Sequence, residues 1–255
     1  MDRTDSKLRQ YTLGVVAHLL LLLAWYLFVH LGHVPKYIMP SPVDTFRLLG
    51  VADYGWWAAT LVTGTEIFGG YALALIVGVI LALLFTWSKS FEALMLPLLV
   101  TLNMIPKVAL GPLIIVWFSY GVLTNTMMAF SIAVFPVLLT TARGLREIEP
   151  DLLDLVRSLR GSRWQLFTKI QLPGALPYVF AGMKVAAILA VAGAIVGEFL
   201  GSDRGLGYLM LQVQVTLDTP AMFMAVILIT LLGVLLYGLV LGLERWLVPK
   251  DARVS

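Results

Sequence analysis

Long apolar runs dominate this 255-residue sequence and restrict it to folds that fit a lipid bilayer. The chain is 60% apolar and only 13% charged, and the charged residues gather in short stretches between the runs. Soluble domains carry a larger share of charged residues. Because an α-helix needs about 20 apolar residues to cross the hydrocarbon core, such runs predict transmembrane helices. The sequence therefore predicts an all-α, multi-pass membrane protein.

Six apolar segments are long enough to cross the bilayer. The first follows a short basic arm and lacks a small-residue cleavage site, so we expect a retained membrane anchor and not a signal peptide. We expect one transmembrane domain over residues 1–255. The predicted spans are residues 11–31, 58–87, 92–120, 124–142, 174–200 and 221–247.

The third predicted span is interrupted by Pro97, Pro106 and Pro112. A proline at membrane depth is tolerated where protein, and not lipid, surrounds the freed carbonyl groups. We therefore expect this segment to depart from a single straight helix and to lie against the centre of the bundle.

Lysine and arginine residues indicate the orientation of the spans. They concentrate in the N-terminal arm, the loop of residues 143–173 and the C-terminal tail, which share one side if there are six spans. Cytoplasmic loops carry the excess of basic residues. Both termini and the large loop are therefore predicted to be cytoplasmic. The net charge of +3 has the same explanation, and no nucleic-acid partner is expected.

Catalytic and metal-binding patterns are not found in the sequence. With no cysteine, thiol chemistry and disulfides are excluded, and His18, His30 and His33 show no metal-ligand spacing. A phosphate-binding loop of the form G-x-x-x-x-G-K-[ST] is also missing. We expect a chain that is not an enzyme and binds no cofactor itself, so energy for any transport must come from elsewhere.

Small residues recur at four-residue spacing along the fifth predicted span. Such a face lets helix backbones approach closely, so we expect this span at the centre of the bundle or at a subunit interface. The residues are Ala186, Ala190, Gly193, Ala194, Gly197 and Gly201.

The loop of residues 143–173 has the pattern of two short helices. Apolar Leu152, Val156 and Leu159 recur at three- and four-residue steps, and Pro150 can begin that helix. Gly161 is expected to end it.

A second short helix is predicted after Gly161. Ser162 and Gln165 have the spacing of a capping box, and Pro173 would end the helix that follows. We interpret the loop as a compact knob that offers a surface to a soluble partner. An amphipathic hairpin lying on anionic lipid is the alternative.

The loop resembles a motif of the permease subunits of bacterial ATP-binding-cassette importers. That motif reads E-A-A, three residues, G, nine residues, I-x-L-P. Here residues 154–156 stand at the first three positions, Arg160 at the glycine, and residues 170–173 (I-Q-L-P) at the close. Leu155, Val156 and Arg160 depart from the family pattern, so the turn is expected at Arg160 or one residue later, at Gly161.

Other segments extend the resemblance to the nitrate/sulfonate/taurine-type branch of type I importers. They are P-S-P before the second span, residues 105–118 and residues 196–209. In this family the loop forms a coupling helix held in a groove of the ATPase subunit. The resemblance implies ATPase contacts at Asp154, Leu155, Val156, Leu159, Arg160, Gly161, Ser162, Trp164, Gln165 and Phe167.

The resemblance also implies a set of partners in the bacterial inner (cytoplasmic) membrane. We expect a second permease chain, forming a homodimer, two cytoplasmic ATPase subunits that hold ATP and Mg, and an extracytoplasmic substrate-binding protein. The imported solute would be a small organic or inorganic anion, such as a sulfonate or nitrate, or a heteroaromatic vitamin precursor.

Polar residues within the predicted spans are candidates for the translocation pathway. A charge near the bilayer centre costs about 2.5–3.5 kcal/mol on insertion scales, so each one requires a reason. Lys107 could meet an anionic substrate or pair with an acidic residue as a structural ion pair. The candidates are Glu66, Asn103, Lys107 and Glu198.

Three other classes of protein remain as alternatives. A secondary transporter driven by an ion gradient would show interrupted helices in both halves of the chain, whereas one span here is strongly interrupted. A membrane-embedded enzyme would gather His, Asp or Glu at one membrane face. The acidic residues here are scattered instead. A purely structural assembly protein is the third alternative, and it leaves the coupling motif unexplained.

Overall fold

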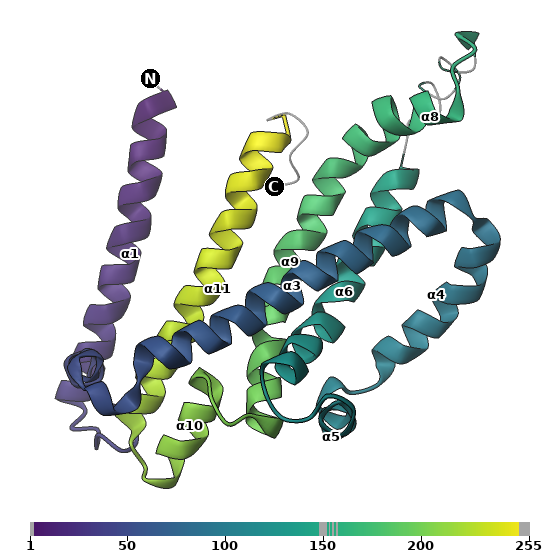
Figure 1. Ribbon diagram of the computed structural model, residues 1–255. Coiled ribbons are helices and arrows are strands. Elements are labelled where there is room, and N and C mark those ends of the chain that lie inside the picture. The colour runs from purple at the N-terminus through teal and green to yellow at the C-terminus, as the bar shows by residue number, and fades with distance from the viewer. Residues whose placement is uncertain (1–2, 148–151, 153, 155, 157, 250–255) are drawn as a thin grey trace. The chain divides into compact units, whose positions relative to one another are not determined.

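The computed structural model describes residues 3–147, 152, 154, 156 and 158–249. These residues are almost entirely helical and contain no strand, which confirms the all-α prediction (Figure 1). The longer helices are α1 (Arg3–Leu31), α3 (Trp56–Trp87), α4 (Lys89–Met104), α5 (Lys107–Phe118), α6 (Val122–Arg146), α9 (Leu172–Gly201), α10 (Leu206–Val215) and α11 (Thr219–Leu247).

Short elements join the long helices. Helix α2 (Pro42–Arg47) is followed by the 3₁₀ turns η1 (Leu48–Gly50) and η2 (Ala52–Tyr54). Helix α8 (Arg163–Leu166) continues through the π-helical turn η3 (Phe167–Gln171) into α9. The segment of residues 163–201 is therefore one continuous helical path.

The chain forms two compact units. The first consists of residues 1–56 and 209–228, and the second of residues 57–208 and 229–255. In the first unit, Trp25 donates a hydrogen bond to the Pro40 carbonyl at 2.9 Å and packs against Phe223, with ring centroids 5.6 Å apart. Thr219 donates to the Tyr37 carbonyl at 2.7 Å. These contacts fasten the start of α11 to the segment after α1.

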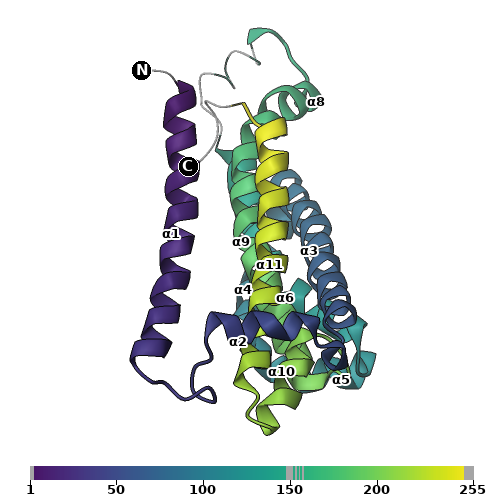
Figure 2. The same ribbon diagram turned by 90° about the vertical axis from the view of Figure 1, so that its left-hand side faces the viewer.

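The second unit is built around the pair α6 and α9, which pack along most of their length (Figure 1). The small-residue face of α9 makes this contact: a β-carbon on Gly193 would lie 2.6 Å from Ala129 Cα, and one on Gly197 2.9 Å from Asn125 Cα. The face therefore places α9 at the centre of this unit. The C-terminal part of α11 runs beside α9, where Gly233 faces Val191 (Figure 2).

Five helices in the described residues are long and apolar enough to cross a membrane. The predicted span 92–120 consists instead of α4 and α5, which meet at a bend of 99° and would together supply a sixth span. The break lies at Ile105–Pro106, where Pro106 caps α5. This confirms that the proline-rich segment is not one straight helix. Pro97 and Pro112 lie inside α4 and α5.

Candidate functional site

The turn between the two parts of the loop is closed by Arg160. This residue adopts a left-handed backbone conformation, with φ at 52°. The Gly161 amide donates a hydrogen bond to the Val156 carbonyl at 2.8 Å. A left-handed residue followed by a bond spanning five residues is the Schellman arrangement that ends helices. The turn therefore lies at Arg160, the position of the family's glycine and the first of the two positions expected from the sequence.

Gly161 serves a different purpose in this turn. A β-carbon at this position would lie 2.6 Å from Val156 Cγ1, too close for any ordinary contact. Because the chain folds back onto Val156, any larger residue here would force the Val156 side chain to shift. Arg160 reverses the direction of the chain, and Gly161 allows its close return.

The capping box predicted from the sequence is confirmed. The Gln165 amide donates to Ser162 Oγ at 3.2 Å, and the Ser162 amide donates to Gln165 Oε1 at 2.8 Å. Reciprocal bonds of this kind satisfy amides that a helix start leaves unpaired. They fix the direction in which α8 leaves the turn.

The loop presents apolar side chains away from the rest of the chain. Leu159 is 74% exposed and Trp164 is 66% exposed. Asp154 is also exposed, and Leu155 lies outside the described residues. Large exposed apolar side chains on a short, capped element are typical of an interaction surface.

Phe167 is buried beneath this surface. Its ring packs against Trp87 and Trp164, each with centroids 5.8 Å away. It joins a core cluster at the ends of α3, α6 and α9 that contains Ala82, Phe85, Leu138, Ala142, Leu145 and Ala175. Phe167 therefore anchors the exposed Trp164 to the transmembrane helices and is not itself available to a partner.

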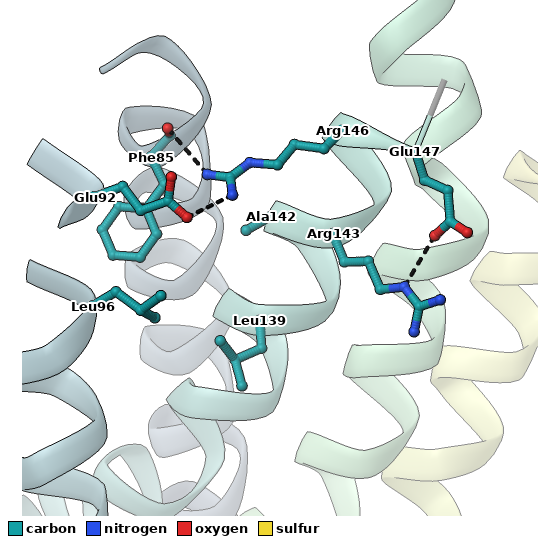
Figure 3. Close-up of a pocket in the computed structure, with 8 residues that line it drawn as sticks. All are labelled: Phe85, Glu92, Leu96, Leu139, Ala142, Arg143, Arg146 and Glu147. Carbon is teal, nitrogen blue, oxygen red and sulfur yellow. Dashed lines mark hydrogen bonds and ion pairs between the residues drawn. The ribbon is translucent and has the colours of Figure 1, made fainter. Parts of the chain in front are cut away.

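A groove of about 390 Å³ opens beside this core cluster, between α3, α4 and α6 (Figure 3). Arg146 spans it, binding Glu92 of α4 at 2.5 Å and the Phe85 carbonyl of α3 at 3.3 Å. Arg143 binds Glu147 at 3.0 Å, and this guanidinium, with the Tyr178 hydroxyl, lowers the pKa of the Glu147 carboxyl. The two ion pairs fix the end of α6 from which the loop departs.

Asn103 and Lys107 meet in a second cavity, of about 320 Å³. The helix does not continue through Pro106, yet the bend returns both side chains to the same space, which Phe135, Pro136 and Leu189 also line. Lys107 Nζ donates to the Leu102 carbonyl at 3.1 Å. Among the described residues it makes no ion pair with an acidic side chain.

Glu66 and Glu198 lie together, and not with Lys107. Both are fully or almost fully buried, and their carboxyl groups interact across the α3–α9 contact. Asn125 of α6 donates to Glu66 Oε1 at 2.8 Å, and Thr63 donates to Glu198 Oε1 at 2.5 Å. The four predicted pathway residues therefore occupy two separate places.

The sequence analysis did not identify Lys184, Glu244 and Asn125. Lys184 of α9 pairs with Glu244 of α11 at 2.8 Å, largely out of contact with solvent. A lone lysine in an apolar run was the available signal. Glu244 lies 60 residues from Lys184 in the chain, and Asn125 lies 59 residues from Glu66, so only the fold brings these partners together.

Comparison with known proteins identifies the class of protein. Residues 74–249 match the family described as "binding-protein-dependent transport system inner membrane component". The chain belongs to this family of importer permeases. In fold it is similar to a structure titled as inward-facing MetNI methionine ABC transporter, with a TM-score of 0.57 and 21% identity over 83% of this chain and 99% of the other.

Three relatives illustrate the similarity. A probable ABC transporter permease protein of Haemophilus influenzae is 37% identical, over 85% of this chain and 89% of its own. The riboflavin transport system permease protein RibX of Chloroflexus aurantiacus is 36% identical, over 93% and 89%. The formylaminopyrimidine transport permease protein ThiX of Halalkalibacterium halodurans is 31% identical, over 91% and 92%.

Proposed function

We propose that this permease works in the bacterial inner membrane as a homodimer, with two cytoplasmic ATPase subunits and an extracytoplasmic substrate-binding protein. ATP and Mg would be held by the ATPase subunits, and this chain would bind neither. Membership of a binding-protein-dependent family supports this set of partners.

The observation that carries the proposal is the exposed apolar pair Leu159 and Trp164 on a braced turn. The Schellman turn and the capping box hold the knob in one shape, and Phe167 joins it to the core at the ends of α3, α6 and α9. A displacement of Trp164 would therefore be transmitted through Phe167 to the transmembrane helices. Such a connection is what coupling ATP-driven closure to an inward-to-outward transition requires.

The solute is proposed to be a small heteroaromatic vitamin precursor. The cavity at the α4–α5 bend supports this, because Phe135, Pro136 and Leu189 give it apolar walls and Asn103 offers both a donor and an acceptor. Two of the relatives above are named for formylaminopyrimidine and riboflavin. A sulfonate- or nitrate-type anion is the second candidate, favoured by the ammonium group of Lys107 in the same cavity.

Reconstitution of the complete transporter in liposomes tests the proposal. ATP hydrolysis is expected to rise on addition of the loaded binding protein, and labelled solute is expected to accumulate only with ATP. The methyl group added by Gly161→Ala would collide with the Val156 side chain, so this variant should abolish the stimulation of ATP hydrolysis by the binding protein. Gly174→Ala is the matched control, because a β-carbon there meets nothing within 4 Å. Accumulation driven by an ion gradient without ATP would contradict the proposal.

A further inference from the structure

Two carboxyl groups share one buried site at the end of the helices opposite the proposed coupling loop. Glu66 comes from α3 and Glu198 from α9, and both side chains are at most 1% exposed. Glu198 accepts a hydrogen bond from Thr63 at 2.5 Å, and Thr63 lies three residues before Glu66 on α3, so the fold brings the two carboxyl groups to the same face of α3. Two like charges in such surroundings repel strongly, because little solvent is present to screen them.

Glu198 is surrounded by hydrogen-bond donors. Thr63 donates to Oε1, and the amides of Gly207 and Tyr208, at the start of α10, both donate to Oε2. The Thr63 hydroxyl itself accepts a bond from the Leu206 amide at 2.8 Å, which fixes its proton toward Glu198. A carboxyl group that accepts three such bonds is best matched as an ionised carboxylate.

Glu66 has the opposite environment. Its Oε1 accepts one bond, from Asn125, and its Oε2 receives no donor from the described residues. Besides Asn125, Glu66 interacts with the carboxyl group of Glu198, which as a carboxylate can only accept a hydrogen bond. A proton on Glu66 would turn this repulsive contact into a hydrogen bond.

Among the described residues no lysine or arginine forms an ion pair with Glu66 or Glu198. Arg204, in the loop after α9, is exposed and pairs with its neighbour Asp203. Lys107 donates to the Leu102 carbonyl, and Lys184 pairs with Glu244. From α6 the group that faces the pair is the neutral amide of Asn125. If both carboxyl groups were ionised, a small cation within the site would have to balance the second negative charge.

We propose that Glu66 and Glu198 bind a single shared proton, carried by Glu66 and donated to the Glu198 carboxylate. The proton links α3 to α9 and, through Gly207 and Tyr208, to the start of α10. Removing it at high pH would place two charges side by side and separate these elements. The pair is then a proton-dependent latch at the end of the pathway opposite the coupling loop.

The proposal predicts an asymmetry between two conservative variants of the full-length protein in detergent. Glu66→Gln supplies an N–H donor where the protonated acid had an O–H, so its unfolding midpoint should stay within about 2 °C of wild type. Glu198→Gln removes the carboxylate from its three donors and should lower the midpoint by about 6 °C or more. Wild type should lose stability between neutral and alkaline pH, whereas Glu66→Gln should not.

Infrared spectroscopy reports the proton directly and does not depend on the variants folding equally well. Wild type at neutral pH should show the C=O stretch of a buried protonated carboxylic acid, which slow hydrogen exchange protects. The band should disappear in Glu66→Gln and persist in Glu147→Gln, which removes an exposed carboxylate. A wild-type spectrum without the band would overturn the proposal. So would stabilisation by sodium but not by choline, because a metal cation would then occupy the site.

Discussion

Lys184 of α9 and Glu244 of α11 form an ion pair at 2.8 Å, in which the glutamate is only 5% exposed and the lysine 19%. Both residues belong to the second compact unit, where the pair joins the central helix to the C-terminal one (Figure 2). Neither side chain faces the cavity at the α4–α5 bend. The pair therefore supports the bundle and is not a candidate for contact with the solute.

Breaking this pair on one side should be costly. Lys184→Met leaves the Glu244 carboxylate buried without its partner, and we expect a loss of about 3–5 kcal/mol in the free energy of unfolding. The double variant Lys184→Met/Glu244→Leu removes both charges and should return stability to the wild-type level or above. Thermal unfolding of the purified chain in detergent measures this, and a double variant no better than the single one would contradict the assignment.

Helix packing between α6 and α9 should tolerate no added methyl group at Gly193. A β-carbon there would lie 2.6 Å from the Ala129 Cα and 3.0 Å from the Met128 carbonyl oxygen, both backbone atoms that cannot rotate away. Gly193→Ala should destabilise the chain by about 1–3 kcal/mol. Gly238→Ala in α11, where nothing lies within 4 Å, should instead gain up to about 1 kcal/mol from helix propensity. Equal effects would show that the α6–α9 contact is looser than described.

Arg160 should be improved by glycine. The left-handed conformation costs a residue with a side chain about 1–2 kcal/mol, and glycine avoids this cost. Glycine also loses more backbone entropy on folding, about 0.5–1 kcal/mol, which cancels part of the stabilisation. Arg160→Gly should slow exchange of the Gly161 amide, which is bonded to Val156, by about two- to fivefold. Arg163→Gly removes the same charge from a right-handed position and should not slow it. Faster exchange in Arg160→Gly would mean that the turn lies elsewhere.

The cavity at the α4–α5 bend should discriminate between the two classes of solute. If a heteroaromatic compound passes through it, Asn103→Leu should raise the KM for uptake about tenfold, because a polar group of the ring loses its partner. Lys107→Gln should then change the KM by less than about threefold. If Lys107→Gln raised the KM more than Asn103→Leu did in the same liposomes, the cavity would instead bind an anion.

Local patterns predicted much of this structure, and long-range partners were not predictable. Apolar runs predicted the helices, Pro106 the break in the third span, and the Ser162–Gln165 spacing the capping box, since each depends on neighbours in the chain. The pairing of Glu66 with Glu198, 132 residues apart, depends instead on how α3 and α9 pack. The sequence left the turn open between Arg160 and Gly161, because a residue with a side chain seldom adopts the left-handed conformation that Arg160 has here.

The proposed docking of an ATPase subunit depends most on the exposed side chains of Leu159 and Trp164, and co-purification tests it most directly. Tagged wild-type chain, expressed with its ATPase subunit and extracted in mild detergent, should retain the ATPase. Trp164→Ala should lose most of it, whereas Trp57→Ala, which removes a tryptophan of similar exposure (74% against 66%) from the far end of α3, should not. If Trp164→Ala retains the ATPase as fully as Trp57→Ala, the knob is not the coupling surface.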